Sequence, residues 1–502
     1  MSLAIVYSRA QEGIHAPEVC VEVHLANGLP AFSIVGLPET AVRESRDRVR
    51  AALQNSHFDF PARRITVNLA PADLPKDGGR FDLPIALGIL AATGQIPSDA
   101  LDRYEFYGEL ALDGALRSVQ GMLPSTWQAV QADRQCVLPI ENADEAALIQ
   151  QASIYPARHL LEVCAHLSGQ RQIPLHHSNL QPDIDPDIPD LADVRGQQLA
   201  RRALEVAAAG GHNLLMVGPP GTGKTMLAKR LAGILPPMSP QESMESAMVW
   251  SISRQGFNAQ QWGIRPFREP HHTASGVALV GGGSHPAPGE VSLAHHGVLF
   301  LDELTEFDRR VLEVLREPLE TGHISISRAA RQADFPASFQ LVAAMNPCPQ
   351  GYDCDLRTHC RCTPEQQRRH RNRISAPLLD RIDLQIEVPR QPAEQMQDEV
   401  ASAENSAQIR ERVESSRVRQ LERQGKPNAH LQAAELARHC ALEASDRKFL
   451  EQAINQLRLS SRAHHRILKV ARTIADLKKH ESINRQHLSE ALSYRAMERF
   501  RD

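Results

Sequence analysis

The stretch Gly218-Pro219-Pro220-Gly221-Thr222-Gly223-Lys224-Thr225 decides the fold of this 502-residue chain. It follows the apolar run 214–217 and precedes a helical pattern over 226–231. The pattern G-x-x-x-x-G-K-[ST] between a strand and a helix is the context that a phosphate-binding loop requires. The glycines let backbone N–H groups turn toward phosphate oxygens, and the helix N-terminus adds a partial positive charge.

Two side chains of this stretch have distinct predicted roles in nucleotide binding. Lys224 would reach the β- and γ-phosphates, and the Thr225 hydroxyl would ligate Mg²⁺. The alternative is a plain Gly/Pro turn after a strand, which the strand–loop–helix context disfavours. We therefore predict a site for ATP and Mg²⁺, with the backbone of 218–225 around the phosphates.

Composition sets limits on the remaining functions. The chain is long enough for about three domains, and its net charge of −4 excludes a uniformly basic nucleic-acid-binding coat while leaving local basic surfaces open. The N-terminus lacks a basic segment followed by a long apolar run, and no segment approaches about 18 consecutive apolar residues. Four of the eight cysteines lie within 348–362, unlike a spread-out disulfide framework. We expect a protein of the reducing cytoplasm with no membrane partner.

Residues 1–170 are predicted to form a separate α/β domain, with strands and helices alternating. The turn 75–80 resembles one in the proteolytic domain of the Lon family, where a nucleophilic serine follows a similar Lys-Asp-Gly turn. The matching residue is Arg80, and no lysine lies between Lys76 and Lys224 to complete a Ser–Lys dyad. We expect a Lon-like fold without proteolysis, serving assembly, partner binding or only as a scaffold.

The expected strands of this domain are Leu3–Tyr7, Val19–Val23, Ala31–Val35 and Ile65–Leu69. The expected helices are Glu39–Gln54, Leu83–Ala92, Ala143–Gln151 and His159–Leu167. An acidic, proline-containing linker over 171–190 follows, because alternating Asp and Pro cannot bury apolar surface. Residues 191–395 are predicted to be an ATPase core and 396–502 an all-helical lid.

The second half of the predicted nucleotide site begins at the apolar run 297–301, which ends in Asp302-Glu303. Such a run suits a parallel strand buried on both faces, with its acids beside the phosphate-binding loop. Asp302 would hold the Mg²⁺ hydration shell, and Glu303 would orient and deprotonate the attacking water. A third strand, 340–345, ends at Asn346, which could hydrogen-bond the water or the γ-phosphate.

Several segments resemble the magnesium-chelatase-like AAA+ ATPases: 265–273, 279–283, 288–290 and 293–303. With the Lon-like domain in front, the whole chain resembles the competence-associated ComM/YifB family. The resemblance implies an α/β P-loop AAA+ core with a parallel sheet and a C-terminal α-helical lid. It also implies a homohexamer assembled with nucleotide or DNA, which acts on single-stranded or branched DNA. Its activity would be branch migration during natural transformation or recombination, with recombination proteins as further partners.

The same resemblance assigns two arginines to ATP hydrolysis. Arg381 lies where the helicase/chelatase branch carries an arginine finger inserted by a neighbouring subunit. The alternative for Arg381 is a surface pair with Asp383. Arg462 is similar to the sensor-2 arginine of the lid, although Arg466 lies close enough to compete for that role.

Two insertions in the ATPase core are the predicted DNA-contacting elements. The first, 238–283, carries Arg268 and contains glycines that permit a mobile loop. The second, 324–335, is predicted to be a hairpin with Arg328 and Arg331 at a basic tip. In related helicases such elements line the central pore, where arginines meet phosphates. A solvated hairpin tip is the alternative.

The cysteine cluster comprises Cys348, Cys354, Cys360 and Cys362. Four thiolates can close a tetrahedral structural Zn²⁺ site, although this spacing is not a common finger pattern. Ordinary unpaired thiols are the alternative. An arginine-rich segment, 361–373, follows and suits either phosphate contact or an inter-subunit surface.

Three functions stay open at this point: a DNA motor, a magnesium-chelatase motor subunit that remodels a partner protein, and a chaperone-type remodelling ring. The Lon-like domain disfavours the second, because that motor subunit normally begins near its ATPase core.

Overall fold

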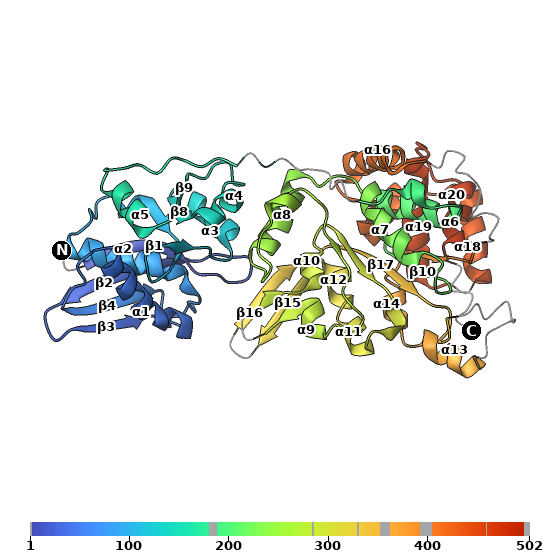
Figure 1. Cartoon of the computed structure of the whole chain (residues 1–502). Helices are drawn as coiled ribbons and strands as arrows, with labels where there is room; N and C mark the ends of the chain where they lie inside the picture. The colour runs from blue at the N-terminus through green and yellow to red at the C-terminus, as the bar shows by residue number, and fades with distance from the viewer. Residues whose placement is uncertain are drawn as a thin grey trace.

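The protein is described by a computed structural model that covers residues 3–178, 180, 188–283, 286–328, 331–351, 362–391, 404–457 and 459–495, without the side chains of 327, 328, 331 and 332. It is elongated (Figure 1): the N-terminal domain lies at one end, the insertions of the core in the middle, and the C-terminal helices at the other end. Among the described residues, no helix is both long and apolar enough to cross a membrane.

The N-terminal domain is built on a mixed seven-stranded sheet of order β3-β4-β2-β1-β5-β8-β9. Its apolar and polar residues alternate along β2, so one face of the strand is buried and the other meets solvent. The buried helix α2 (Asp82–Thr93) covers the inner face, and a Cβ at Gly88 would lie 2.4 Å from Cγ2 of Val23. The strands are β1 (Leu3–Arg9), β2 (Glu18–Ala26), β3 (Ala31–Val35), β4 (Arg64–Ala70), β5 (Tyr104–Phe106), β8 (Gln135–Pro139) and β9 (Ile154–Ala157).

The predicted elements of this domain are largely confirmed, with one correction. The helix expected over 143–151 is only α4 (Ala143–Ala146), because the chain then tightens into i→i+3 bonds from Leu148 to Glu145 and from Ile149 to Ala146. The other helices are α1 (Thr40–Asn55), α3 (Met122–Gln131) and α5 (Leu160–Leu167), and a short hairpin pairs β6 (Glu109–Leu110) with β7 (Leu116–Arg117). Helix α3 was not predicted.

The core contains a five-stranded, fully parallel sheet of order β11-β14-β17-β10-β18. Its three central strands are buried throughout and apolar except for Gln340, as expected for a sheet covered on both faces. The register sets Val217 opposite Met345 and Leu301 opposite Ala343, so the chain segments after these strands leave the sheet at one edge. The strands are β10 (Leu214–Val217), β11 (Phe267–Arg268), β14 (Val298–Leu301), β17 (Gln340–Met345) and β18 (Leu384–Glu387).

The C-terminal helices pack around α6 (Gln198–Gly210) of the core, as predicted for an all-helical region. Arg417 donates to the carbonyl oxygens of Ala208 and Ala209, and Arg423 makes two bonds of 2.7 and 2.9 Å to Asp476. These helices are α16 (Ser406–Gln424), α17 (Ala433–His439), α18 (Ala444–Gln456), α19 (Ser461–Leu477) and α20 (Arg485–Ser493).

The two insertions occupy the middle of the molecule in Figure 1. The second is the predicted hairpin: β15 (His323–Arg328) pairs antiparallel with β16 (Arg331–Pro336). The first contains α8 (Pro240–Ser251), α9 (Gly276–Val280) and β12 (Gly281–Gly282). The remaining core elements are α7 (Lys224–Leu231), β13 (Ala287–Pro288), α10 (Glu290–Leu293), α11 (Arg309–Glu313), α12 (Arg316–Thr321), α13 (Pro364–Arg371) and α14 (Ala376–Leu379).

Helix α8 is joined to the N-terminal domain at the start of α3, a contact we call the α3–α8 joint. Gly121 N donates to Ser251 O at 2.9 Å, and Leu123 N donates to Ser251 Oγ at 3.3 Å. Ala247 is buried in the same apolar cluster as Leu123. Arg80, the residue at the position of the Lon nucleophile, donates to the carbonyl oxygen of Gln120 and so holds the chain entering the joint.

Candidate nucleotide site

The 218–223 loop connects β10 to α7 at the carboxyl edge of the parallel sheet. Gly221 and Gly223 have φ angles of 76° and 84°, which glycine adopts without steric cost. A Cβ at Gly218 would lie 2.2 Å from the carbonyl oxygen of Val388, so the start of the loop also excludes a side chain. Both constraints give the loop the compact backbone that the sequence pattern predicts.

Lys224 is buried inside this loop, with its ammonium group held by oxygen atoms. Its Nζ donates to Gly218 O at 2.7 Å, Pro219 O at 2.9 Å and Asn346 Oδ1 at 3.2 Å. Burial lowers the pKa of Lys224, against the attraction of the nearby Asp302 and Glu303 carboxylates. A desolvated cation whose hydrogen-bond acceptors are neutral amide oxygens is well suited to a phosphate. Lys224 and Asn346, which were predicted as site residues from separate segments of the sequence, therefore lie together.

The two predicted Mg²⁺-binding side chains are in direct contact. The Thr225 hydroxyl donates to Asp302 Oδ2, and the other carboxylate oxygen accepts from Glu303 N at 2.8 Å. A hydroxyl beside a carboxylate is the hard oxygen donor set that Mg²⁺ prefers, normally completed by water and phosphate. The residues present therefore fit ATP with Mg²⁺.

Glu303 has a partner that sequence reasoning did not assign. Its backbone is left-handed, with φ 50°, and its Oε2 lies 3.3 Å from Nδ1 of His272 in the first insertion. The pairing of β11 with β14 is the signal that could have indicated this contact, because residues after adjacent parallel strands meet at one edge. The eight-residue run 265–272 alone does not predict that pairing.

Arg381 lies at the opposite edge of the sheet from the 218–223 loop. It precedes β18, and its carbonyl oxygen accepts from Nδ2 of Asn213, which precedes β10, at 2.9 Å. Its guanidinium group pairs with Glu320 and donates to Pro377 O at 2.6 Å. Within one chain, the predicted arginine finger, Arg381, therefore lies far from the phosphate-binding loop of that same chain, at the other edge of the sheet.

Arg462 lies beside Arg381, and both line a cavity of 210 Å³ together with Arg466. Arg462 is two-thirds exposed, and its Nη1 lies 3.7 Å from Asp380 Oδ2.

The pair between Arg381 and Asp383, considered from the sequence, is wrong. Asp383 is instead held by Arg466 and His212. Although burial alone would raise the pKa of Asp383, these two partners hold it below its ordinary value.

Arg268 is paired within the chain, and its role in DNA contact stays a prediction. Its guanidinium group makes a two-pronged pair with Glu290, at 2.6 and 2.9 Å, and it is stacked over Trp250. Such a bidentate pair uses the fork of donors that a phosphate would need. Arg328 and Arg331 are opposite each other in the hairpin register, and their side chains lie outside the described residues.

The zinc prediction is only partly covered by the described residues. Cys348 is buried just after Asn346, and Cys362 is half-buried just before α13. Cys354 and Cys360 lie outside the described residues. The Zn²⁺ site stays a prediction.

Glu245, His295 and His296 form a group with metal-ligand character in the described part of the chain. Nε2 of His296 lies 2.6 Å and Nε2 of His295 lies 3.6 Å from the same Glu245 oxygen. However, His295 Nδ1 accepts from Ser338 N at 3.0 Å, so in the neutral ring the proton sits on Nε2. A protonated nitrogen cannot ligate a metal. The group is a hydrogen-bond network that lowers the pKa of Glu245 to about 2, chiefly through His295.

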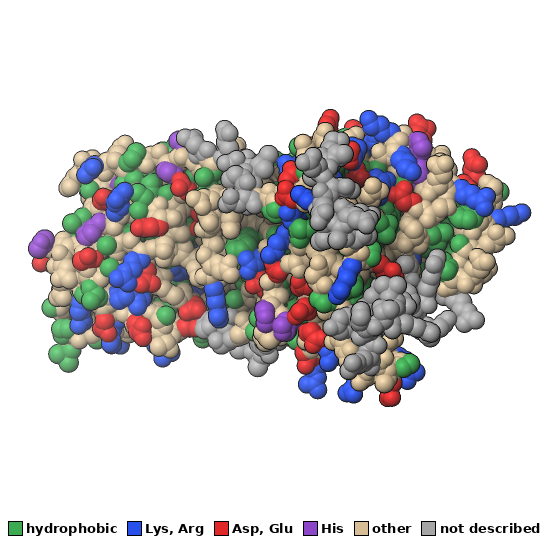
Figure 2. All heavy atoms as spheres, turned by 45° about the vertical axis from the view of Figure 1, so that its right-hand side comes forward, with side chains coloured by type: hydrophobic (Ala, Val, Ile, Leu, Met, Phe, Trp, Pro, Cys, Tyr) green, Lys and Arg blue, Asp and Glu red, His purple; other side chains and the backbone are tan. Residues whose placement is uncertain are grey.

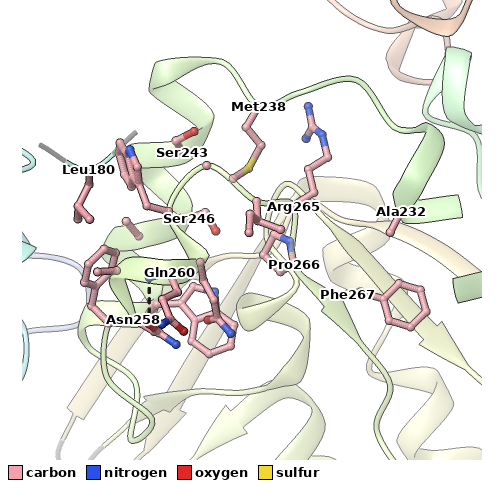
Figure 3. Close-up of a pocket in the computed structure, with 18 of the residues that line it drawn as sticks. Leu180, Ala232, Met238, Ser243, Ser246, Asn258, Gln260, Arg265, Pro266 and Phe267 are labelled. Atoms are coloured by element: carbon pink, nitrogen blue, oxygen red, sulfur yellow. Dashed lines mark hydrogen bonds between the residues drawn. The ribbon is translucent and has the colours of Figure 1, made fainter. Parts of the chain in front are cut away.

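A cavity of 800 Å³ lies between α8 and the segment 257–268 (Figure 3). Ser243 and Ser246 of α8 line one part of it, and Asn258 and Gln260 line another. None of residues 218–225, 302 or 303 lines it, so it is separate from the nucleotide site.

Comparisons with known proteins agree with this arrangement. Family profiles described as "Subunit ChlI of Mg-chelatase", "Magnesium chelatase, subunit ChlI" and "Magnesium chelatase, subunit ChlI C-terminal" match residues 21–142, 190–396 and 403–495. The chain is 25% identical to Lon protease 2 of Bacillus subtilis over 34% of each protein, which supports the Lon-like interpretation of part of the chain.

Full-length relatives are far more similar. The chain is 54% identical to the competence protein ComM of Haemophilus influenzae, over 99% of this chain and 98% of that protein. It is 52% identical to the YifB protein of Salmonella typhimurium, with the same coverage. The chain therefore belongs to the ComM/YifB family of magnesium-chelatase-like AAA+ proteins.

Proposed function

We propose that copies of this chain form a hexameric ring that hydrolyses ATP and moves along DNA. Its task would be branch migration as a DNA strand is integrated during natural transformation or recombination. The name of the ComM relative, a competence protein, supports the biological setting. The match to the magnesium-chelatase family profile supports ATP as the hydrolysed nucleotide.

The observation that carries the ring proposal is the separation of Arg381 from the 218–223 loop. The two lie at opposite edges of one sheet, so a complete site would need the loop of one copy and Arg381 of the next. A subunit with one half-site at each edge makes head-to-tail contacts, and these close into a ring when the rotation between copies permits. Arg462 would enter the neighbour's site together with Arg381, because both line the same cavity.

Each residue of the site has a role in the proposed reaction. Lys224 and the loop backbone would hold the phosphates of ATP, and Thr225 with Asp302 would hold Mg²⁺. Glu303 would orient a water molecule and accept its proton, while Asn346, which accepts from the Lys224 ammonium group, would hydrogen-bond that water. Bound Mg·ATP supplies the phosphoanhydride bond to be cleaved. Arg381 would leave Glu320 and donate to the developing phosphate charge of the neighbour.

DNA binding would rest on local elements and not on a broadly basic surface. Figure 2 shows basic and acidic side chains interspersed over the visible face, in keeping with the net charge of −4. The hairpin β15–β16, with Arg328 and Arg331, and the exposed Arg368 and Arg369 of α13 are the proposed phosphate contacts. Lining a central pore with these arginines would neutralise phosphates without sequence preference.

ATPase rates with and without DNA test this proposal. We expect forked or single-stranded DNA to raise the rate, Lys224→Ala to abolish nucleotide binding, and Glu303→Gln to retain bound ATP without turnover. If every DNA structure leaves the rate unchanged while ATP is still hydrolysed, the DNA motor is contradicted. The alternative, a magnesium-chelatase-like or chaperone-type motor that remodels a protein, would then replace it.

A further inference from the structure

We infer that the 800 Å³ cavity between α8 and the segment 257–268 is a binding site for an uncharged, planar heterocycle of the nucleobase kind. The base would belong either to a free nucleoside or to an unstacked position of single-stranded DNA, and both sources share the chemistry that the lining recognises. The inference goes beyond the proposed function, which assigns no role to this cavity.

The floor of the cavity carries two buried hydroxyl groups that have no protein partner. Ser243 and Ser246 lie one helical turn apart on α8, are 3% and 4% exposed, and both line the cavity (Figure 3). Neither side chain makes a hydrogen bond with any of the described residues. Burying a hydroxyl without a hydrogen bond costs free energy, so a ligand that bonds to these two groups is favoured.

Four aromatic side chains line the walls of the same cavity. Trp250 of α8 and Trp262 are half-buried, and Phe257 and Phe267 complete the set. Two of the three tryptophans of the chain therefore gather at one cavity. Aromatic side chains hold unpaired bases by stacking, and one such contact is worth about ten-fold in affinity.

The rim of the cavity adds carboxamide groups held by a tight turn. Gln260 N donates to Asn258 Oδ1 at 3.0 Å (Figure 3), and Trp262 N donates to Ala259 O at 3.2 Å. The turn sets the exposed side chains of Asn258, Gln260 and Gln261 beside Trp262, and all four line the cavity. A carboxamide offers a donor and an acceptor side by side, which matches the polar edge of a base.

The charged side chains at the cavity are already paired within the chain. Among the described lining residues, only Arg265 and Arg268 are charged. Arg265 donates to the carbonyl oxygens of Pro236 and His296, each at 2.6 Å, and Arg268 makes its bidentate pair with Glu290. With both guanidinium groups saturated in this way, the lining favours the uncharged base of a nucleotide over its phosphate.

Tryptophan fluorescence tests the inference, because the Trp127→Phe variant leaves Trp250 and Trp262 as the only tryptophans. Trp127 is 40% exposed on α3 and does not line the cavity. With the nucleotide site saturated by Mg·ADP, we expect thymidine and deoxyadenosine each to quench the emission in a saturable way, because a base stacked on an indole ring quenches its fluorescence.

Two oligomers of equal length distinguish the sources of the base. Quenching by a short oligothymidylate, but not by the corresponding abasic oligomer, identifies a base of single-stranded DNA as a ligand. Quenching by the nucleosides alone identifies a free nucleoside.

Substitutions at the floor and the rim locate the binding site, all in the Trp127→Phe background. Ser246→Leu should abolish nucleoside binding by filling the space beside α8, and Ser246→Ala should weaken it about two- to ten-fold by removing one hydroxyl. Gln260→Ala should weaken binding by a similar factor. Gln255→Ala is the matched control, because Gln255 is an exposed glutamine nearby that does not line the cavity.

Three results would overturn the inference. They are the absence of saturable quenching by both nucleosides and the oligothymidylate, equal quenching by the abasic oligomer with none by the nucleosides, and unchanged affinity in both Ser246→Ala and Gln260→Ala. The last comparison holds even when Ser246→Leu does not fold. None of these results bears on whether DNA raises the ATPase rate, so the proposed DNA motor stands or falls separately.

Discussion

His487 ties the stability of the C-terminal helices to pH through a single buried ring. It is fully buried in α20, its Nδ1 accepts from Asn484 N at 3.1 Å, and its Nε2 lies 3.1 Å from Nδ1 of His480. Burial, and then the nearby Lys478 and His480, lower the pKa of His487 to about 4. The folded protein therefore keeps this ring neutral at pH values where an unfolded histidine takes up a proton.

The expected consequence is a loss of stability between pH 6.5 and pH 4. The unfolded chain binds the proton below about pH 6.5 and the folded chain only below about pH 4, so the contribution is complete above 6.5 and falls as the pH drops. Between pH 7 and 5 it should cost about 2 kcal/mol of the free energy of unfolding. Hydrogen exchange of the α19 and α20 amides measures this change. His487→Asn should remove it, whereas His465→Asn, an exposed histidine of α19, should keep it.

Side-chain pairings mark the limit of sequence reasoning at the residue scale. Strand order and motif spacing predict that Lys224, Thr225, Asp302 and Asn346 meet, and the structure brings them together. The contact of His272 with Glu303 could not be predicted in the same way. It depends on the path of the loop after β11, which motif spacing does not specify. The pair between Arg268 and Glu290 could not be predicted for the same reason.

At the scale of elements, α8 depends on tight packing against the N-terminal domain. Ala247 is 4% exposed in the apolar cluster that it shares with Met122 and Leu123. We expect Ala247→Arg to separate α8 from α3, because the larger charged side chain must overpack the contact or expose it to water. Limited proteolysis should then release the N-terminal domain faster. Gln241→Arg, on the exposed side of the same helix, should leave the cleavage rate unchanged.

Helices and strands were predicted correctly where apolar and polar residues repeat with a clear period. They were missed where that repeat does not follow the buried and exposed faces. The alternating strands β1–β4 and the amphipathic α1 were predicted to within a few residues. Helix α3 was missed because the polar Ser125 and Thr126 are buried while Trp127 is 40% exposed, so the polar and apolar residues of the sequence do not mark its buried face. Pro124 lies in the first turn of this helix, where proline is tolerated.

At the scale of the whole molecule, Arg381 and the 218–223 loop lie at opposite edges of the sheet, so hydrolysis in the proposed ring should require two copies. Mixing Arg381→Ala subunits with Lys224→Ala subunits should therefore restore part of the ATPase rate, because a mixed interface can combine an intact loop with an intact arginine. Each variant alone should be inactive. If mixtures stay as inactive as the single variants while still assembling, Arg381 does not act between subunits.

The α3–α8 joint has a consequence for how this chain can vary between organisms. One of its hydrogen bonds joins two main-chain atoms, Gly121 N and Ser251 O, and so does not depend on the side chain at position 251. Position 121 must still adopt its φ of 72°, which restricts that residue to glycine or a residue that tolerates the left-handed region. Apart from that fixed point, this main-chain hydrogen bond tolerates sequence change on both sides, so divergence at the joint is limited by the packing of Ala247 against Leu123 and by the bond to Ser251 Oγ.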